Sequence, residues 1–158
     1  MSVTADIVES WRRPRVVVRR LLVHRSEPFA FSLLVTGLIL LFVSLAPYLA
    51  REAYYQPVQP LTQRMLASAL AIAATVPFWY LLAALAHLVA RVMGGKGSYF
   101  GGRVALFWAL VAASPALLTS GLVRGMRGTG GAADLVGLGA GLAFVVLWLV
   151  MLGEAERG

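Results

Sequence analysis

The 158-residue chain contains no cysteine and few charged residues. The absence of cysteine excludes disulfide bonds, cysteine-ligated zinc, iron–sulfur clusters and thiol catalysis. Charged residues make up 13% of the chain, whereas a soluble domain has about 25%. Hydrophobic residues make up 59%, which is too many for a disordered chain. The composition therefore predicts a protein that places most of its surface in a membrane.

Acidic and basic side chains are absent from four long apolar runs. A helix needs about 20 residues to cross the hydrocarbon core of a bilayer, and each run has about that length. A charged side chain in mid-span would cost about 2.5–3.5 kcal/mol. The sequence therefore predicts an all-α, polytopic membrane protein with four transmembrane helices. The membrane domain is predicted over residues 29–158, with spans at about 29–50, 65–90, 104–123 and 135–153.

Basic residues are unequally divided among the segments outside these runs. Six lie before the first span, three between the second and third spans and one in the tail, whereas the two other connections hold two each. Because basic segments stay in the cytoplasm during insertion, both termini are expected there. The bias towards Arg, Ala and Gly favours a bacterial inner membrane. In so hydrophobic a chain, topology and anionic lipid explain the net charge of +7 better than nucleic acid does.

Residues 1–28 form a basic arm with an amphipathic pattern. On a helical projection Ile7, Trp11, Val18 and Leu22 share one side, and Pro14 is expected to divide the helix. This pattern is typical of a helix that lies in the inner-leaflet interface. A solvated arm that only fixes the topology is the alternative. The candidate residues for lipid headgroups are Arg12, Arg13, Arg15, Arg19, Arg20 and Arg25.

A glycine-rich segment at residues 94–102 contains a Gly-Lys pair but does not fit a phosphate-binding loop. Lys96 is followed by Gly97 instead of Ser or Thr, and a helix instead of a strand is expected before it. We expect a turn here and no bound nucleotide. His87 precedes Arg91 by one helical turn, and no other histidine or acid lies within the spans. We therefore expect His87 at the membrane interface.

Prolines and glycines within the spans predict helix geometry. Pro77 and Pro115 are expected to kink the second and third spans. Transporters use such kinks, but no charged residue accompanies either proline, so static kinks are expected. Gly137 and Gly141 form a GxxxG pair that permits close helix packing, either within the chain or with a second copy. No set of nucleophile, base and paired carboxylates emerges, so no enzyme activity, metal or cofactor is predicted.

Three stretches carry a family resemblance. The second span and the loop after it cover residues 84–102, Trp108 and the Ser114-Pro115 step follow, and the fourth span closes as LWLVMLGEAE over residues 147–156. This order resembles the Yip domain family of small polytopic membrane proteins, especially its short bacterial members. The resemblance covers about residues 29–156 and implies a helical membrane fold. The family usually has five spans, whereas four are expected here.

The resemblance implies little about mechanism. Eukaryotic members act in vesicle traffic and bind small GTPases, but their acidic, Tyr-containing cytoplasmic motif has no match in this arm. We therefore expect a scaffold, assembly or accessory subunit without catalytic activity, acting through intramembrane helix packing and a basic cytoplasmic face. Its expected partners are anionic lipids and other membrane subunits or a second copy. A small oligomeric transporter or channel is the alternative, and it would line a cavity near Pro77, Pro115 and His87 with polar groups.

Overall fold

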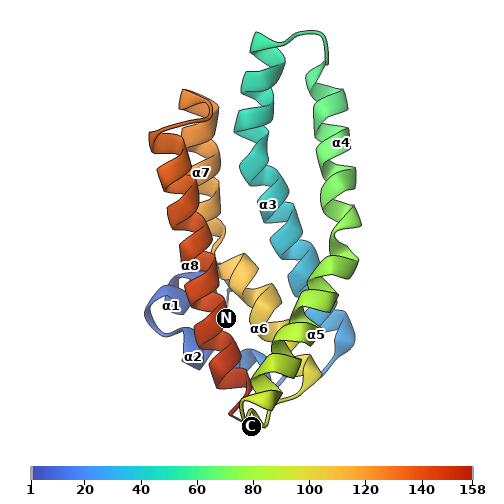
Figure 1. The fold of residues 1–158 in the computed structure, drawn as a ribbon, viewed down its shortest axis with the longest axis vertical. Coiled ribbons are helices and arrows are strands. Elements are labelled where there is room, and N and C mark those ends of the chain that lie inside the picture. The colour runs from blue at the N-terminus through green and yellow to red at the C-terminus, as the bar shows by residue number, and fades with distance from the viewer. Residues whose placement is uncertain (1, 158) are drawn as a thin grey trace.

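The computed structural model describes residues 2–157, and all regular structure in this part of the chain is helical (Figure 1). The predicted ranges 1–28 and 29–158 each include one residue, Met1 or Gly158, that lies outside the described part. The helices are α1 (Val3–Arg12), α2 (Pro14–Leu21), α3 (Glu27–Tyr55), α4 (Leu61–Ala74), α5 (Val76–Val92), α6 (Tyr99–Ala112), α7 (Ser114–Arg127) and α8 (Ala132–Ala155).

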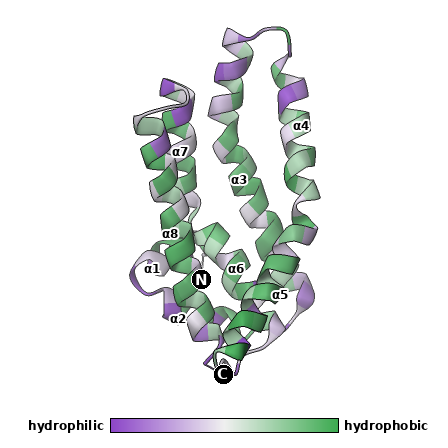
Figure 2. Cartoon of the chain, viewed as in Figure 1, coloured by the Kyte–Doolittle hydropathy of each residue, from purple (hydrophilic) through white to green (hydrophobic). Residues whose placement is uncertain are grey.

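The predicted class, an all-α polytopic membrane protein, is confirmed. Three stretches are long and apolar enough to cross a membrane: α3, α8, and α4 with α5 as one stretch, Leu61–Val92. The pair α6 and α7 counts as a fourth if it forms one span, bent by 44° at the break. Hydrophobic residues fill the middle of these helices, and hydrophilic residues gather towards both ends (Figure 2).

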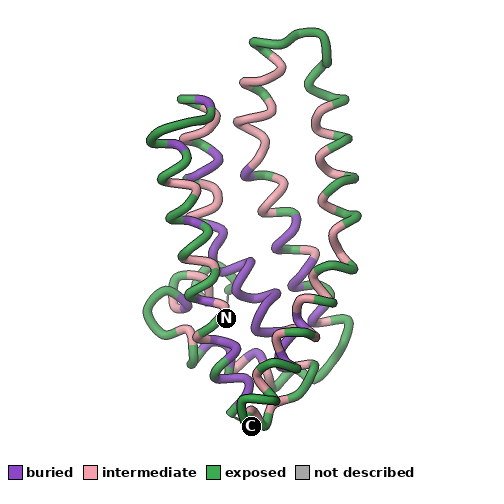
Figure 3. Tube along the Cα trace, viewed as in Figure 1, coloured by how far each residue is buried: buried purple, intermediate pink, exposed green. Residues whose placement is uncertain are grey.

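The helix α6 forms the centre of the molecule. Residues 104–113 are each at most 3% exposed, and Phe107 and Trp108 are among the largest fully buried side chains. A helix that is apolar on every side is stable only when neighbours or lipid surround it. Here α3, α5, α8 and the arm helices α1 and α2 surround α6, which makes it the continuous buried segment in Figure 3.

The closest approach of two helices joins α7 to α3. A Cβ atom added at Gly121 would overlap the carbonyl oxygen of Ser44, and one at Gly125 would lie 2.5 Å from Cβ of Pro47. Gly121 and Gly125 are four residues apart, so they lie on the same face of α7. This GxxxG pair allows the two backbones to touch.

The arm differs from the sequence-based interpretation in what its apolar face meets. The break predicted at Pro14 is present, since α1 ends at Arg12 and α2 begins at Pro14. Val18, predicted to face lipid, is fully buried together with Val17, because α2 packs against α6 and α8. Ile7 and Leu22 are partly buried against the same core. The apolar face of the arm therefore covers protein, because α6 offers apolar side chains on that side.

Candidate functional site

The arm is joined to the bundle where α6 breaks. Pro115 has no amide hydrogen, and the amide of Ala116 bonds to the oxygen of Ala113, 3.0 Å away. The carbonyl oxygen of Ala112 is instead an acceptor for Nε1 of Trp11 in α1, at 2.8 Å. A buried carbonyl needs such a donor, so the arm supplies a hydrogen bond that the break in the helix leaves unmade.

A second tryptophan makes the reciprocal connection. Nε1 of Trp108 in α6 donates to Oγ of Ser10 in α1, at 2.9 Å. The same hydroxyl donates to the carbonyl oxygen of Asp6, at 2.7 Å. Ser10 is fully buried, so it is satisfied by two partners in the core. Two indole N–H groups, one from each helix, thus fix α1 against α6.

Ion pairs fold the arm upon itself and onto α8. Arg20 binds Asp6 at 2.8 Å and Glu9 at 3.0 Å, which ties α2 to α1. Arg19 pairs with Glu154 near the end of α8. Two of the six arginines predicted to contact lipid headgroups are therefore engaged within the chain. The headgroup role of the six stays a prediction.

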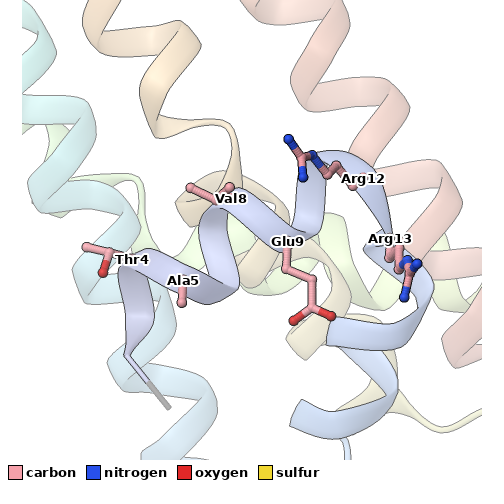
Figure 4. A pocket seen from close by; sticks show the side chains of 6 residues that line it. All are labelled: Thr4, Ala5, Val8, Glu9, Arg12 and Arg13. Carbon is pink, nitrogen blue, oxygen red and sulfur yellow. The ribbon is translucent and has the colours of Figure 1, made fainter.

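The remaining arginines of the arm lie towards its surface. Arg12 and Arg13 line an open hollow along α1, with Glu9 and Val8 beside them (Figure 4). Arg15 and Arg25 are exposed as well. The side chains that line the hollow come from α1 and the turn after it, so the hollow is a surface feature of the arm alone.

Near the C-terminus, a tail residue forms a buried pair with a histidine of α5. Nδ1 of His87 and Oε1 of Glu156 lie 2.6 Å apart, and both side chains are at most 6% exposed. The ring of Tyr99 meets the imidazole edge-on, with 4.4 Å between the ring centroids. His87 therefore has an acidic partner that sequence reasoning did not identify, because Glu156 lies outside the predicted spans. This partner comes from the tail, 69 residues later in the sequence. The position of His87 at the membrane interface stays a prediction.

The glycine-rich loop also contacts the tail. The amide of Lys96 donates to the carbonyl oxygen of Glu156 at 2.8 Å, and the amide of Gly97 donates to its Oε2 at 3.2 Å. A Cβ atom at Gly97 would overlap the carbonyl oxygen of Ala155, and one at Gly95 would lie 2.7 Å from Oε2 of Glu156. These glycines allow the loop backbone to approach the end of α8.

The predicted kink residues lie next to helix breaks. Pro77 lies in the first turn of α5, after the break at Thr75. There the Thr75 hydroxyl donates to the Ile72 carbonyl at 2.6 Å and accepts from Nε1 of Trp79 at 3.1 Å. Pro115 lies in the first turn of α7. It lines a cavity of about 540 Å³ between α1, α7 and α8, where Arg12 and Thr119 are the polar side chains, and neither Pro77 nor His87 lines it.

The two glycines of the predicted GxxxG pair, Gly137 and Gly141, have different surroundings in the structure. A Cβ atom at Gly137 would lie 2.8 Å from the Arg124 side chain, so this glycine faces α7. A Cβ atom at Gly141 would have no described atom within 4 Å. Close packing at Gly141 therefore has no partner in residues 2–157 and stays a prediction for a second molecule. A pair with the same spacing that meets a neighbouring helix is Gly121 and Gly125 on α7, and sequence reasoning missed it.

Comparison with known proteins adds one match. The sequence profile of the Yip1 domain matches residues 8–157, a range that begins within α1 and ends after α8. No curated protein and no solved structure matches the chain. The matched range is longer than the resemblance seen in the sequence and includes most of the arm.

Proposed function

The chain belongs to the Yip1 domain family, and on this premise we propose that it is a membrane subunit without catalytic activity. It acts as a scaffold, assembly or accessory subunit by packing a helix against another membrane protein within the bilayer. Two findings support this proposal: the family match, and helices that are long and apolar enough to cross a membrane. The main observation behind it is that α4, which lies wholly within the described residues, has no buried residue.

The helix α4 is the least covered part of the membrane domain. None of its 14 residues, all within the described chain, is buried. In the most apolar 18 residues of Leu61–Val92, only 6% of the residues are buried, against 33% in the corresponding part of α3. Leu66, Ala67, Leu70 and Ala71 are exposed along α4. Small residues beside leucines permit close approach of another helix, so this surface suits an apolar helix of a partner.

We also propose the bacterial inner membrane as the location, with both termini in the cytoplasm. The α5–α6 loop and the C-terminus lie at one end of the molecule, and the α3–α4 and α7–α8 connections at the other (Figure 1). Arg19, Arg25, Lys96 and Arg157 lie together at the first end, which supports a cytoplasmic position. At that end the exposed Arg25 would meet anionic lipid.

Single cysteines test the orientation, because the chain has none of its own. Ser98 and Gln59 are exposed in loops at opposite ends of the molecule. An impermeant thiol reagent added to intact cells is expected to label Gln59→Cys and to spare Ser98→Cys. Both variants should react after the cells are opened. Labelling of Ser98→Cys alone in intact cells would reverse the orientation.

Photo-crosslinking tests the proposed function. A photoreactive amino acid replaces Leu70 on α4 or, as the matched control, Leu142 on α8; these leucines are 63% and 58% exposed. The proposal expects one discrete protein adduct from position 70, with the same partner identified by mass spectrometry in independent preparations. Position 142 should give lipid adducts only. Adducts between two copies of this chain alone would favour the oligomeric transporter or channel, and lipid adducts at both positions would contradict an α4 partner.

A further inference from the structure

We propose that a cavity at the C-terminal end of the bundle binds the headgroup of a glycerophospholipid, specifically a phosphate diester that carries a hydroxyl or ammonium donor. The basal cavity, as we call it, has a volume of about 1030 Å³. Its walls come from the end of α2, the turn after it and the start of α3, from the α5–α6 loop with the first turn of α6, and from the end of α8. This binding site is separate from the partner surface on α4.

Positive charge exceeds negative charge around the cavity. Its basic residues are Arg19, Arg25, Lys96 and Arg157, and its acidic residues are Glu27 and Glu154. Glu27 pairs with Arg103, which does not line the cavity, and Arg19 and Arg157 both pair with Glu154. Within residues 2–157, no acid pairs with Arg25 or Lys96. These two cations are therefore available for an anion.

The first turn of α6 adds donors to the same wall. Ser98 caps the helix by accepting from the amide of Gly101 at 3.1 Å. The amides of Tyr99 and Phe100 have no acceptor in the described part of the chain. A helix N-terminus has a partial positive charge and open N–H groups, which favours a phosphate. The α6 end and the two cations thus favour the same kind of ligand.

A buried acceptor restricts the ligand further. Oε2 of Glu154 is buried and has no hydrogen-bond donor in residues 2–157, and the Glu154 side chain is 4% exposed. A guanidinium nitrogen of Arg157 lies 3.5 Å from this oxygen without forming a hydrogen bond. A buried carboxylate oxygen requires a donor. A fully ionised phosphate offers none, whereas a glycerol hydroxyl or an ethanolamine ammonium beside the phosphate does.

The position of the cavity favours a lipid over a soluble phosphate. Leu22, Val23 and Phe100 line it together with the charged groups. The first apolar run begins at Phe29, close after Glu27 in the cavity wall. A site with cations and an apolar wall next to the start of a span suits a headgroup whose acyl chains extend along the protein.

The experiment uses the full chain, purified in detergent and stripped of lipid. Native mass spectrometry measures the binding of phosphatidylglycerol, phosphatidylethanolamine, phosphatidic acid and phosphatidylcholine at equal concentrations. The first two lipids carry a donor and are expected to bind most. Because each cation at an anionic surface contributes about 1 kcal/mol, Arg25→Gln and Lys96→Gln should each reduce this binding about fivefold.

Matched control variants distinguish binding in this cavity from nonspecific attraction of anionic lipid to a basic surface. Arg91 is exposed at the same end but does not line the cavity, so Arg91→Gln should leave binding unchanged. Glu154→Gln should remove the preference for donor-bearing lipids over phosphatidylcholine, whose quaternary ammonium has no N–H. If that variant fails to fold, the lipid series on the unmodified chain still tests the donor requirement. Equal losses in Lys96→Gln and Arg91→Gln, or equal binding of all four lipids, would overturn the proposal.

Soluble headgroups distinguish the source of the phosphate. Glycerol phosphate and ethanolamine phosphate are tested as competitors at the same concentration as the lipid. Failure to displace the lipid supports a lipid site. Displacement that depends on Lys96 would overturn the lipid as the occupant and assign the cavity to a soluble phosphate. The measurement needs no partner protein, so its failure is distinguishable from failure of the proposed subunit role.

Discussion

The helices α6 and α4 have the same length of 14 residues and a similar apolar character, yet they lie at opposite extremes of burial. Residues 104–113 of the α6 region are almost completely covered, whereas no residue of α4, described throughout, is buried (Figure 3). Lipid tails surround Leu and Ala as favourably as a protein core does, so apolar composition does not decide which helix is covered. Shape and hydrogen bonding decide it.

The side chains of the two helices differ in these respects. The helix α6 carries Phe107 and Trp108, and the indole of Trp108 has an acceptor in α1. Gly37 of α3 lets the backbone approach Leu110, since an added Cβ would lie 2.8 Å from that side chain. The sequence of α4 contains no aromatic residue. Large aromatic side chains and a hydrogen bond to α1 thus hold α6 in the core. The helix α4 offers neighbouring helices no aromatic side chain.

The largest expected effect comes from separating the packed helices at Gly121. In Gly121→Leu the new side chain would collide with the α3 backbone at Ser44. Such a collision should lower the free energy of unfolding by about 3 kcal/mol or more. The readout is the yield of monodisperse protein on size-exclusion chromatography in mild detergent, which should fall as the folded state is destabilised. The matched control is Gly141→Leu, which enters open space and should leave the monomer unchanged. A stable Gly121→Leu protein would contradict the close contact of α3 and α7.

A direct comparison of the two helices removes one large side chain from each. Phe107→Ala should lower the free energy of unfolding by about 3–5 kcal/mol, because it leaves a cavity in the core. Leu70→Ala on α4 should change it by less than about 0.5 kcal/mol, as expected at an exposed position. Thermal unfolding in the same detergent measures both. Similar losses would show that α4 is as well packed as α6.

A smaller effect is expected where the arm meets the break in α6. Trp11→Phe keeps the ring but removes the hydrogen bond to Ala112, which should destabilise docking of the arm by about 1–2 kcal/mol. Faster trypsin cleavage after Arg12 is the readout, since the Arg13–Pro14 bond resists trypsin. In residues 2–157 the buried indole N–H of Trp148 has no acceptor, so Trp148→Phe is the control that should leave the cleavage rate unchanged. Equal cleavage of the two variants would argue against the Trp11 bond.

The smallest stability change is expected on the exposed surface of α4. Ala71→Leu should alter the free energy of unfolding by less than about 0.5 kcal/mol, because Ala71 is exposed. The same change should abolish the protein adduct formed from position 70, since a larger side chain keeps a partner helix at a distance. An unchanged adduct would place the partner elsewhere.

The sequence predicts the elements that depend on local chemistry. Uncharged length predicts the spans, and the missing amide of Pro14 predicts the division of the arm. Contacts between segments that are distant in the sequence depend on how the helix surfaces fit together. The pattern of residue types along the chain does not contain this information. Gly121 and Gly125 have the same spacing as Gly137 and Gly141, but spacing only permits approach and does not name the neighbouring helix. Likewise, His87 and Glu156 are 69 positions apart, so no local pattern indicates that they pair.

The bond between Trp11 and Ala112 also has a consequence for biosynthesis. Its partners are 101 residues apart, so at translation rates of about 5–20 residues per second the arm precedes its docking site by about 5–20 s. During that interval most of the core against which Ile7 and Val18 pack, including α6, has not yet been made. The arm therefore docks late: the two tryptophans can join α1 to α6 only after both helices have been made.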